Sequence, residues 1–527
     1  MGHSDKFNET TPLIKEIHIQ SEHSARHTEF EHTLGVWQAI KVYSPAVFWC
    51  IIATLTVVLN GFDNALIGSL ISVESFAEQF GRPYDNGYVI NAAWLGAFNY
   101  AAMLGAAIGS LAAGVLYDVL GPKKTLGLCI TGSIGAISVQ FLASTPAVLF
   151  LGLLANGILV GFFPVIASAY IGEVCPVVLR GIMGSMVNLG FVIGQLIASG
   201  LLKTTEKMDS AWAYKMPLAS QCVLPTILLL FLPFMPASPW WLVRKGKLEK
   251  ARKALDKLST KAVKTKYALA NIEETLSHEQ NSGEKVNVLD CFKGTNLRRL
   301  IIAVMAYQLQ PLTGNVFFIT YSVYFFTNAG LSISDAFSLK LWLTIAGFVA
   351  TLLAWPVMSW TGRRPILIVG TAALTVTMFL IGVLDLDAIR TSSSIYAQSV
   401  LMVFATIVYD LSTGPLCFVI LCEIPAPRVR GITIAIASVL TSITSVVITV
   451  LIPYGLNIDE LNWGGKVGFV FMGLGVLCTM WCFFCLPESK GRTFEELDIL
   501  FEKEIPSRKF QDYDVLNDED EEYAILY

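Results

Sequence analysis

EVCPVVLRGI at Glu173–Ile182 and EIPAPRVRGI at Glu423–Ile432 are similar stretches of this chain, and they lie 250 residues apart. Each begins with a glutamate that is followed by an arginine seven residues later. Further along, PASP begins at Pro236 and PESK begins at Pro487, an offset of 251 residues. Two similar pairs in the same order and at nearly the same offset indicate an internal duplication.

A third pair lies ahead of the first. GPKK begins at Gly121 and GRR begins at Gly362, 241 residues later. The three collinear pairs predict two homologous halves joined by a polar linker. One class of membrane transporter is built from parallel repeats of this kind and forms its binding site between them.

The composition predicts a protein embedded in a lipid bilayer. Of 527 residues, 54% are hydrophobic and 15% are charged, and the mean hydropathy is +0.59. A soluble protein carries about 25% charged residues. Apolar runs within a membrane form helices, because each backbone polar group must be paired inside the segment. We therefore expect an all-α membrane protein, and the net charge of −4 gives no basic field for nucleic acid.

The apolar runs predict twelve transmembrane helices in two pseudo-symmetric six-helix bundles. A helix needs about 20 apolar residues to cross the bilayer core. The predicted helices are 46–71, 89–116, 124–143, 146–170, 182–202, 216–236, 300–326, 336–357, 365–384, 397–421, 432–454 and 467–486. The predicted divisions are a cytosolic tail (1–45), the N-terminal bundle (46–236), a cytosolic linker (237–299), the C-terminal bundle (300–486) and a second cytosolic tail (487–527).

Lysine and arginine gather on one side of these predicted helices. The segment from Arg244 to Arg299 holds 14 Lys and Arg against seven Asp and Glu, whereas the opposite loops are poor in cations. Cytoplasmic loops carry the excess of Lys and Arg in membrane proteins. We therefore expect a multi-pass protein with both termini in the cytosol.

Charged residues recur at the predicted cytosolic face of both halves. Each half places a cationic turn after its second helix, and a glutamate with an arginine after its fourth. Opposite charges of this kind can hold two bundles in one arrangement and exchange for water when the bundles separate. The predicted gating and latch residues, which include the intramembrane acid Asp410, are Asp118, Lys123, Lys124, Glu173, Arg180, Arg363, Arg364, Asp410, Glu423, Arg430 and Glu488. The alternative is that the charges at the cytosolic face only set the orientation of the chain.

Nothing in the sequence indicates an enzyme, a metal site or a cofactor. It contains no nucleophile–base pair, no metal-ligand spacing and no Walker motif, and all six histidines lie outside the apolar runs. We expect no catalytic residue, no metal and no cofactor.

Longer motifs carry a resemblance to a known family. GFDNALIGSL (Gly61–Leu70), VNLGFVIGQLIASG (Val187–Gly200), MSWTGRR (Met358–Arg364) and LPESKGRTFEELDILFE (Leu486–Glu502) resemble motifs of the sugar porters of the major facilitator superfamily. They are similar in particular to the fungal maltose and general α-glucoside permeases. The resemblance implies the twelve-helix fold of that superfamily and transport of an α-glucoside or a hexose by alternating access.

Three departures from that branch affect proton coupling. The branch has acidic residues where this chain has Asn60, Ala106 and Leu153. The acidic cluster associated with coupling is thereby reduced to Asp63, which becomes the candidate proton-coupling residue. A carboxylate that only bonds to its neighbours is the alternative reading of Asp63, so symport and facilitated diffusion both stay open.

Amide and aromatic side chains in the predicted helices are the candidates for substrate binding. An unpaired amide inside a membrane is costly, so each of these amides needs a protein or substrate partner. The resemblance implies the substrate-binding residues Gln195, Gln310, Asn315 and Tyr321, and Gln308 joins them because it shares a helix face with Asn315. Hydrogen bonding between helices is the alternative role for the amides.

Two other functions stay open from the sequence. The eleventh helix carries Thr441, Ser442, Thr444 and Ser445 among Ile and Val, which fits a less polar cargo, so the same fold would import or export a non-sugar metabolite. A nutrient sensor that binds sugar without moving it is the second alternative. The expected partners are a small molecule, the lipid bilayer and, for a symporter, protons.

Overall fold

The computed structural model describes most of the chain from Glu31 to Tyr513, and Arg26 before it. The residues inside this range that it does not describe are 32, 71–72, 85–86, 91, 206–207, 209, 261–262, 280–287, 323–324, 327–332, 387–391, 457–460 and 462.

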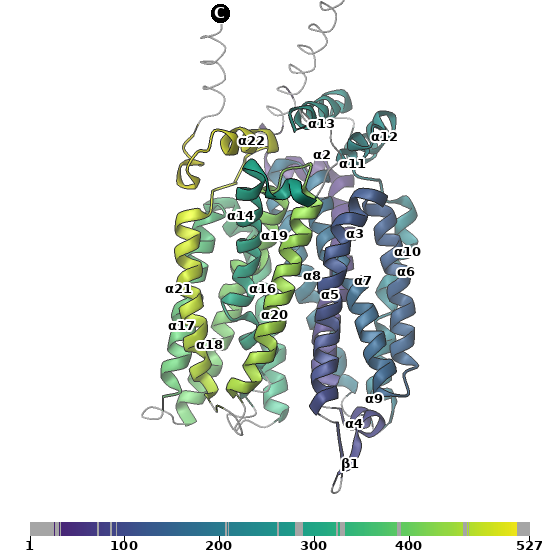
Figure 1. The fold of residues 1–527 in the computed structure, drawn as a ribbon, viewed down its shortest axis with the longest axis vertical. Coiled ribbons are helices and arrows are strands. Elements are labelled where there is room, and N and C mark those ends of the chain that lie inside the picture. The colour runs from purple at the N-terminus through teal and green to yellow at the C-terminus, as the bar shows by residue number, and fades with distance from the viewer. Residues whose placement is uncertain are drawn as a thin grey trace, which may run out of the picture.

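The first half of the chain forms a helical bundle with a small hairpin at one end (Figure 1). The hairpin is antiparallel and pairs Arg82 with Val89. The elements are α2 (Val36–Val42), α3 (Ser44–Leu70), α4 (Glu74–Phe80), β1 (Arg82–Tyr84), β2 (Gly87–Val89), α5 (Ala92–Leu120), α6 (Pro122–Phe141), α7 (Pro146–Val174), α8 (Val177–Thr205), α9 (Trp212–Ser220), α10 (Val223–Phe231) and η1 (Leu232–Phe234).

The linker and the second half follow. The linker contains α11 (Pro239–Arg244), α12 (Leu248–Leu258), α13 (Thr265–Glu279) and η2 (Val288–Phe292). The second bundle contains α14 (Gly294–Leu312), the π-helical turn η3 (Val316–Thr320), α16 (Ile333–Thr361), α17 (Arg364–Leu384), α18 (Ser392–Leu411), α19 (Thr413–Glu423), α20 (Arg430–Leu456), η4 (Gly464–Val467) and α21 (Gly468–Cys485), and the tail adds α22 (Phe494–Glu502) and η5 (Ser507–Lys509).

Twelve spans are present in the part of the chain that the structure describes. Ten helical segments are long and apolar enough to cross a membrane. The other two are α6 and α14, which carry charged residues in their first turns or close to them and run beside the other spans. The twelve predicted helices are therefore all present, six in each bundle.

The two ends of the molecule differ. Helices α2, α11–α13 and α22 lie over one end of the bundles, which we call the capped face, and β1 and α4 lie at the other end, which we call the hairpin face (Figure 1). The capping helices begin at residues suited to that position. Ser238 accepts a hydrogen bond from the backbone N–H of Trp241 ahead of α11, and Thr493 forms a capping box with Glu496 ahead of α22.

Several helices extend further toward the capped face than the apolar runs predict. Asp118, Glu173, Arg180 and Arg430 lie within the ends of α5, α7, α8 and α20, although the sequence suggested loops for the two arginines. Helix ends rich in charge are difficult to place by hydropathy, because burial within a bundle lets a charged helix end continue.

Two predicted helices are interrupted. The seventh breaks after Leu312, where Pro311 and the positive φ of Gly314 (95°) end α14, and the chain continues as η3. The tenth changes direction at Ser412, between α18 and α19. At these breaks Ser412 faces Gly370 of α17 and Gly314 faces Phe471 of α21, so both positions pack within the second bundle.

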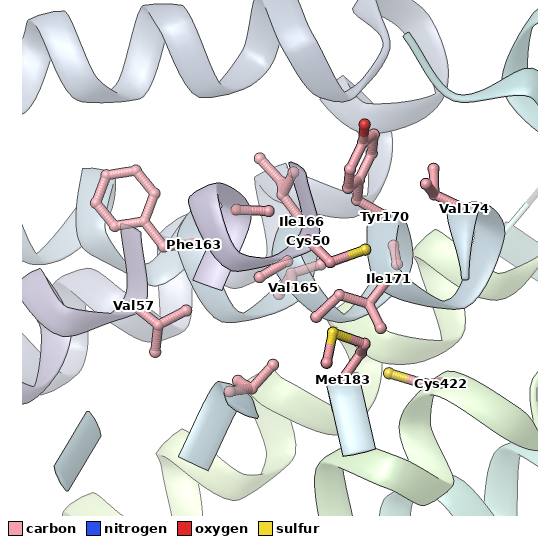
Figure 2. Close-up of a cluster of buried hydrophobic side chains, with 14 of the residues drawn as sticks. Cys50, Val57, Phe163, Val165, Ile166, Tyr170, Ile171, Val174, Met183 and Cys422 are labelled. Atoms are coloured by element: carbon pink, nitrogen blue, oxygen red, sulfur yellow. The ribbon is translucent and has the colours of Figure 1, made fainter. Parts of the chain in front are cut away.

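Among the described residues, the apolar cluster that both bundles share extends to the capped face. One apolar cluster includes residues of α3, α7 and α8 from the first half together with α19 and α20 from the second. Figure 2 shows part of it, with Cys422 of α19 lying close to Met183 of α8 and Ile171 of α7. Toward the hairpin face the clusters are separate, one around Phe76 in the first half and one around Phe317 in the second. The conformation is thus one in which the halves are closed together at the capped face.

Candidate functional site

A cavity of about 240 Å³ lies between the two bundles. Helices α3, α5, α7 and α8 line it from the first half, and α14, η3, α18, α19 and α20 line it from the second. Its polar lining residues are Asn60, Asn64, Ser110, Asn188, Gln195, Tyr307, Gln310, Asn315, Thr320, Tyr409, Asp410, Ser438, Thr441, Ser442 and Ser445. Amides, hydroxyls and phenols predominate, and the ring of Phe191 in α8 stacks on the ring of Phe418 in α19, across the two halves.

The second half supplies a hydrogen-bonded group at this cavity. The hydroxyl of Tyr409 donates to Oε1 of Gln310 at 2.8 Å, and Nδ2 of Asn315 donates to that hydroxyl at 3.2 Å. The Nε2 amide of Gln310 donates to the sulfur of Cys417. Gln310 and Asn315 lie on either side of the break between α14 and η3 and both line the cavity, and the buried Oδ1 of Asn315 has no donor among the described residues. An acceptor of this kind can take a hydrogen bond from a hydroxyl of a bound molecule.

The predicted substrate-binding residues do not all line the cavity. Gln195, Gln310 and Asn315 do, from the two opposing halves. Gln308 is buried in α14 outside the lining, and the hydroxyl of Tyr321 donates to the backbone carbonyl of Thr449 at 2.8 Å. That bond connects the η3 region to α20, so Tyr321 joins two walls of the site.

Asp63 is buried within the first half and is not among the residues that line the cavity. Asn156 of α7 donates to its Oδ2 at 2.7 Å, and Gln221, between α9 and α10, donates to its Oδ1 at 2.8 Å. Both partners are neutral amides. The carboxyl group of Asp63 thus links α3 to α7 and to the segment between α9 and α10, all within the first bundle.

Asp410 is the acid that lines the cavity, among the residues described. It is 3% exposed and lies in α18, and Nδ2 of Asn188 in α8 donates to its Oδ1 at 3.0 Å. This hydrogen bond crosses from one bundle to the other. The predicted gating residue thus lies at the cavity between the bundles, apart from the charge networks of the capped face.

Glu423 is the centre of a buried charge network at the capped face of the second half. Its carboxylate accepts two hydrogen bonds from the guanidinium of Arg363, at 2.8 and 3.2 Å, and one from Ser489 at 2.6 Å. Burial alone would lower the pKa of Arg363, but the carboxylates of Glu423 and Glu488 outweigh it and hold that pKa above its ordinary value. Such a pair is costly to break, because either partner alone would be a buried uncompensated charge.

Glu488 holds the first turn of α17. Its oxygens accept the backbone N–H groups of Arg363 and Arg364, each at 3.0 Å. The side chain of Arg364 turns away and donates to the backbone carbonyl of Phe483 at 2.9 Å. A carboxylate at this position satisfies N–H groups that a helix N-terminus leaves unpaired.

The matching network of the first half uses a different cation from the one predicted. The carboxylate of Glu173 accepts hydrogen bonds from Tyr117 at 2.6 Å, from Arg244 at 2.9 Å and from Ser238. The repeated motif suggested Arg180 as the partner of Glu173 and Arg430 as the partner of Glu423, but the ion pairs of the described residues join Glu173 to Arg244 and Glu423 to Arg363. The reason lies in the repeat: Pro122 stands where the second half has Arg363, so Arg244 of the linker provides the charge.

Arg244 also contacts the second half. Its Nη1 donates to the backbone carbonyl of Pro427, and its Nη2 lies 3.8 Å from the carboxylate of Asp118. The lysines of the adjacent turn are more peripheral. Lys123 donates to the backbone carbonyl of Pro233 at 2.6 Å, and Lys124 is exposed.

Arg180 and Arg430, the arginines of the repeated motif, share an aromatic partner. Their guanidinium carbons lie 3.7 and 4.0 Å from the ring centroid of Phe494 in α22. Both side chains are buried, and every guanidinium nitrogen of Arg430 lacks a hydrogen-bond acceptor among the described residues. Phe494 therefore stabilises one cation from each half.

Comparison with known proteins decides the family. A family model described as "Sugar (and other) transporter" matches residues 49–501. The chain belongs to this sugar transporter family. The predicted membership and the predicted all-α fold of two six-helix bundles are confirmed.

Relatives of this sugar transporter span almost its full length. It is 31% identical over 519 residues to the general alpha-glucoside permease of Saccharomyces cerevisiae, covering 97% of this chain and 83% of the permease. It is 30% identical over 514 residues to a maltose permease of the same yeast, covering 96% of this chain and 83% of that protein. Its fold matches the proton:xylose symporter XylE of E. coli bound to 6-bromo-6-deoxy-D-glucose, with a TM-score of 0.77, 24% identity and coverage of 87% of this chain and all of the symporter.

The sequence departures of this sugar transporter fall in two places. Asn60 and Ala106 line the cavity, whereas Leu153 lies in the apolar core of the first half. Asn60 accepts a hydrogen bond from Asn64 at 3.0 Å, so amides occupy this wall.

Several site residues of the sugar transporter were missed in the sequence. Tyr409, Asn188 and Phe418 line the cavity, and Arg244 and Phe494 complete the networks at the capped face. Arg244 follows the PASP motif and Phe494 follows the PESK motif, so their position after a repeated proline motif was an available signal. For Asn188 the only available signal was a polar side chain within an apolar helix.

Proposed function

We propose that this sugar transporter moves an α-glucoside or a hexose across the plasma membrane by alternating access. The observation that carries the proposal is the cavity itself. It lies between the bundles, its walls are mostly amide, hydroxyl and aromatic groups from both halves, and the shared core closes it off from the capped face. Sites for small polar molecules combine apolar and aromatic surface with a few placed polar groups.

The capped face is the cytosolic face in this proposal. It carries the linker helices, whose segment is rich in Lys and Arg, and both the first and the last described segments of the chain lie there (Figure 1). The positive-inside rule then places both termini in the cytosol. In this orientation the structure is closed toward the cytosol.

Sugar binding follows from the chemistry of the walls. Gln195 on one side, and Gln310 and Asn315 on the other, offer both donors and acceptors to the hydroxyls of a sugar. A sugar that bonds both walls draws the halves together on the hairpin side. Opening of the capped face then requires the Arg244–Pro427 contact and the Phe494 contacts to break.

Uptake of labelled maltose and glucose by a transport-deficient yeast that expresses the chain tests the proposal. We expect saturable uptake of at least one of the two. A protonophore and the variant Asp63→Asn then separate the modes: loss of uptake with both indicates proton symport, and indifference to both indicates facilitated diffusion. Absence of sugar uptake together with export of another metabolite would favour the non-sugar alternative, which the wall of Ser438, Thr441, Ser442 and Ser445 on α20 also suits.

Replacing Tyr409 with phenylalanine is expected to weaken sugar binding. The variant removes the hydroxyl that fixes both Gln310 and Asn315. Each of the two lost hydrogen bonds is worth about 1 kcal/mol, so we expect KM to rise by up to about thirtyfold. Initial rates of uptake across sugar concentrations measure the change. Tyr396→Phe, on the exposed side of the same helix, is the control, and an equal effect of both variants would contradict the assignment.

A further inference from the structure

Asp63 and Asp410 are buried acids within the predicted spans, and they differ in how they contact the two bundles. Asp63 has hydrogen-bond partners from its own bundle. Asp410 lines the cavity and accepts a hydrogen bond from Asn188 of the opposite bundle. A change of protonation at Asp410 therefore acts directly on a contact between the halves.

The surroundings of Asp410 are neutral. Nδ2 of Asn188 also lies 3.4 Å from Oγ1 of Thr351 in α16, and the phenol of Tyr409 next to Asp410 is engaged with Gln310 and Asn315. No cation contacts Asp410 in the part of the chain that the structure describes. An ionised carboxylate among neutral partners in a membrane interior is costly, whereas the neutral acid can hydrogen-bond at little cost.

The charged groups on the packed elements are distant. On α8, Arg180 and Lys203 are eight and fifteen residues from Asn188, roughly 12 and 22 Å along the helix. On α16, Lys340 is eleven residues from Thr351, roughly 16 Å. On α17, Arg364 is six residues from Gly370, which faces Ser412. Among the described residues, the phenol of Tyr307 also lines the cavity, and the thiol of Cys417 contacts Gln310.

We propose that Asp410 is a proton-binding site of the transport cycle. The inference rests on the transport function proposed above and adds a second acid to Asp63. Water in the cavity delivers a proton to the Asp410 carboxylate while the cavity is open to the exterior. The neutral acid stays bonded to Asn188 while the halves are closed around it, and the proton leaves to cytosolic water after the capped face opens. One proton thus enters on one side and leaves on the other with each loaded cycle.

The variant Asp410→Asn tests this assignment, because an amide keeps a hydrogen-bonding group and removes the exchangeable proton. The protein is reconstituted in liposomes with the sugar that the wild type takes up. Exchange of labelled for unlabelled sugar at equal pH measures substrate movement, and accumulation under an inward proton gradient measures coupling. A pH difference of one unit sustains about a tenfold sugar gradient when one proton moves with each sugar.

We expect Asp410→Asn to retain exchange and to lose accumulation, and Asn188→Ala, which keeps the acid, to retain accumulation at a lower rate. Accumulation by Asp410→Asn equal to that of the wild type would overturn the assignment, as would a wild type that exchanges sugar but never accumulates it. A wild type without exchange of any sugar refutes the proposed function instead. If Asp410→Asn does not fold, Asp410→Glu carries the test: its pH profile of uptake must shift from that of the wild type, and an unchanged profile overturns the inference.

Discussion

Replacing Glu423 with glutamine is expected to reduce turnover by about one hundredfold or more, because breaking a buried ion pair costs about 3–5 kcal/mol. The variant leaves the guanidinium of Arg363 buried without its bidentate partner. That guanidinium lies against Gly181 of the opposite bundle, where a Cβ would overlap it, so its displacement disturbs the closed capped face. Substrate affinity should change far less, since Glu423 does not line the cavity.

The rate and KM of uptake separate these two effects. Glu423→Asp keeps the charge and should recover part of the turnover, whereas a neutral substitution at the exposed Lys124 should leave turnover unchanged. An increase in KM at constant maximal rate in Glu423→Gln would show that the residue contributes to binding rather than to closure.

Phe494→Ala is expected to open the capped face. The substitution removes the ring shared by Arg180 and Arg430 and the edge contact with Trp240, whose centroid lies 5.6 Å from that of Phe494. Truncation of a buried phenylalanine costs about 3–5 kcal/mol, and each cation–π contact about 0.5–2 kcal/mol. Two guanidinium groups without other acceptors for most of their nitrogens then draw water into the interface.

Alkylation of Cys422 reports this opening. Its thiol is buried and lies 3.3 Å from the carbonyl of Ser168 across the interface, so a permeant maleimide should modify it much faster in Phe494→Ala than in the wild type. Cys422→Ala in the same background identifies the labelled site. Phe494→Trp keeps an aromatic face over the arginines, so Cys422 should remain protected from alkylation in this variant. Equal labelling of Cys422 in Phe494→Ala and Phe494→Trp would show that the aromatic ring does not hold the capped face closed.

The bundle architecture was predictable because it depends on the apolar runs themselves and on motifs that occur in both halves. Apolar runs of sufficient length must be helical in a membrane, and the duplicated Glu173 and Glu423 motifs divide the chain into halves. The fold and the family followed from these features together with the longer motifs. Hydropathy placed the interrupted spans, whereas the break in the seventh is indicated by Pro311 and Gly314, which affect backbone geometry and barely affect hydropathy.

The partners within the site were less predictable, because they depend on which helix faces meet. Asp63 lies next to cavity-lining residues in the sequence, yet its carboxyl group is bonded within its own bundle. The partner of Asp410 is 222 residues away, and nothing local to either residue indicates the pair. Sequence spacing likewise suggested Arg180 for Glu173, whereas the chain supplies Arg244. The roles predicted for these residues stay predictions that the experiments above address.

Because Arg244 belongs to the linker, the first half depends on a residue outside its six spans for its central ion pair, and the second half does not. The second half carries both members of its central ion pair, whereas the first half obtains its cation from beyond its last span. A chain divided into two separately expressed fragments should therefore reassemble well when the cut follows Gly246, which keeps Arg244 with Glu173. A cut before Ser238 would instead leave the buried carboxylate of Glu173 without its cation in the first fragment. That fragment should be less stable and should be degraded faster in the cell.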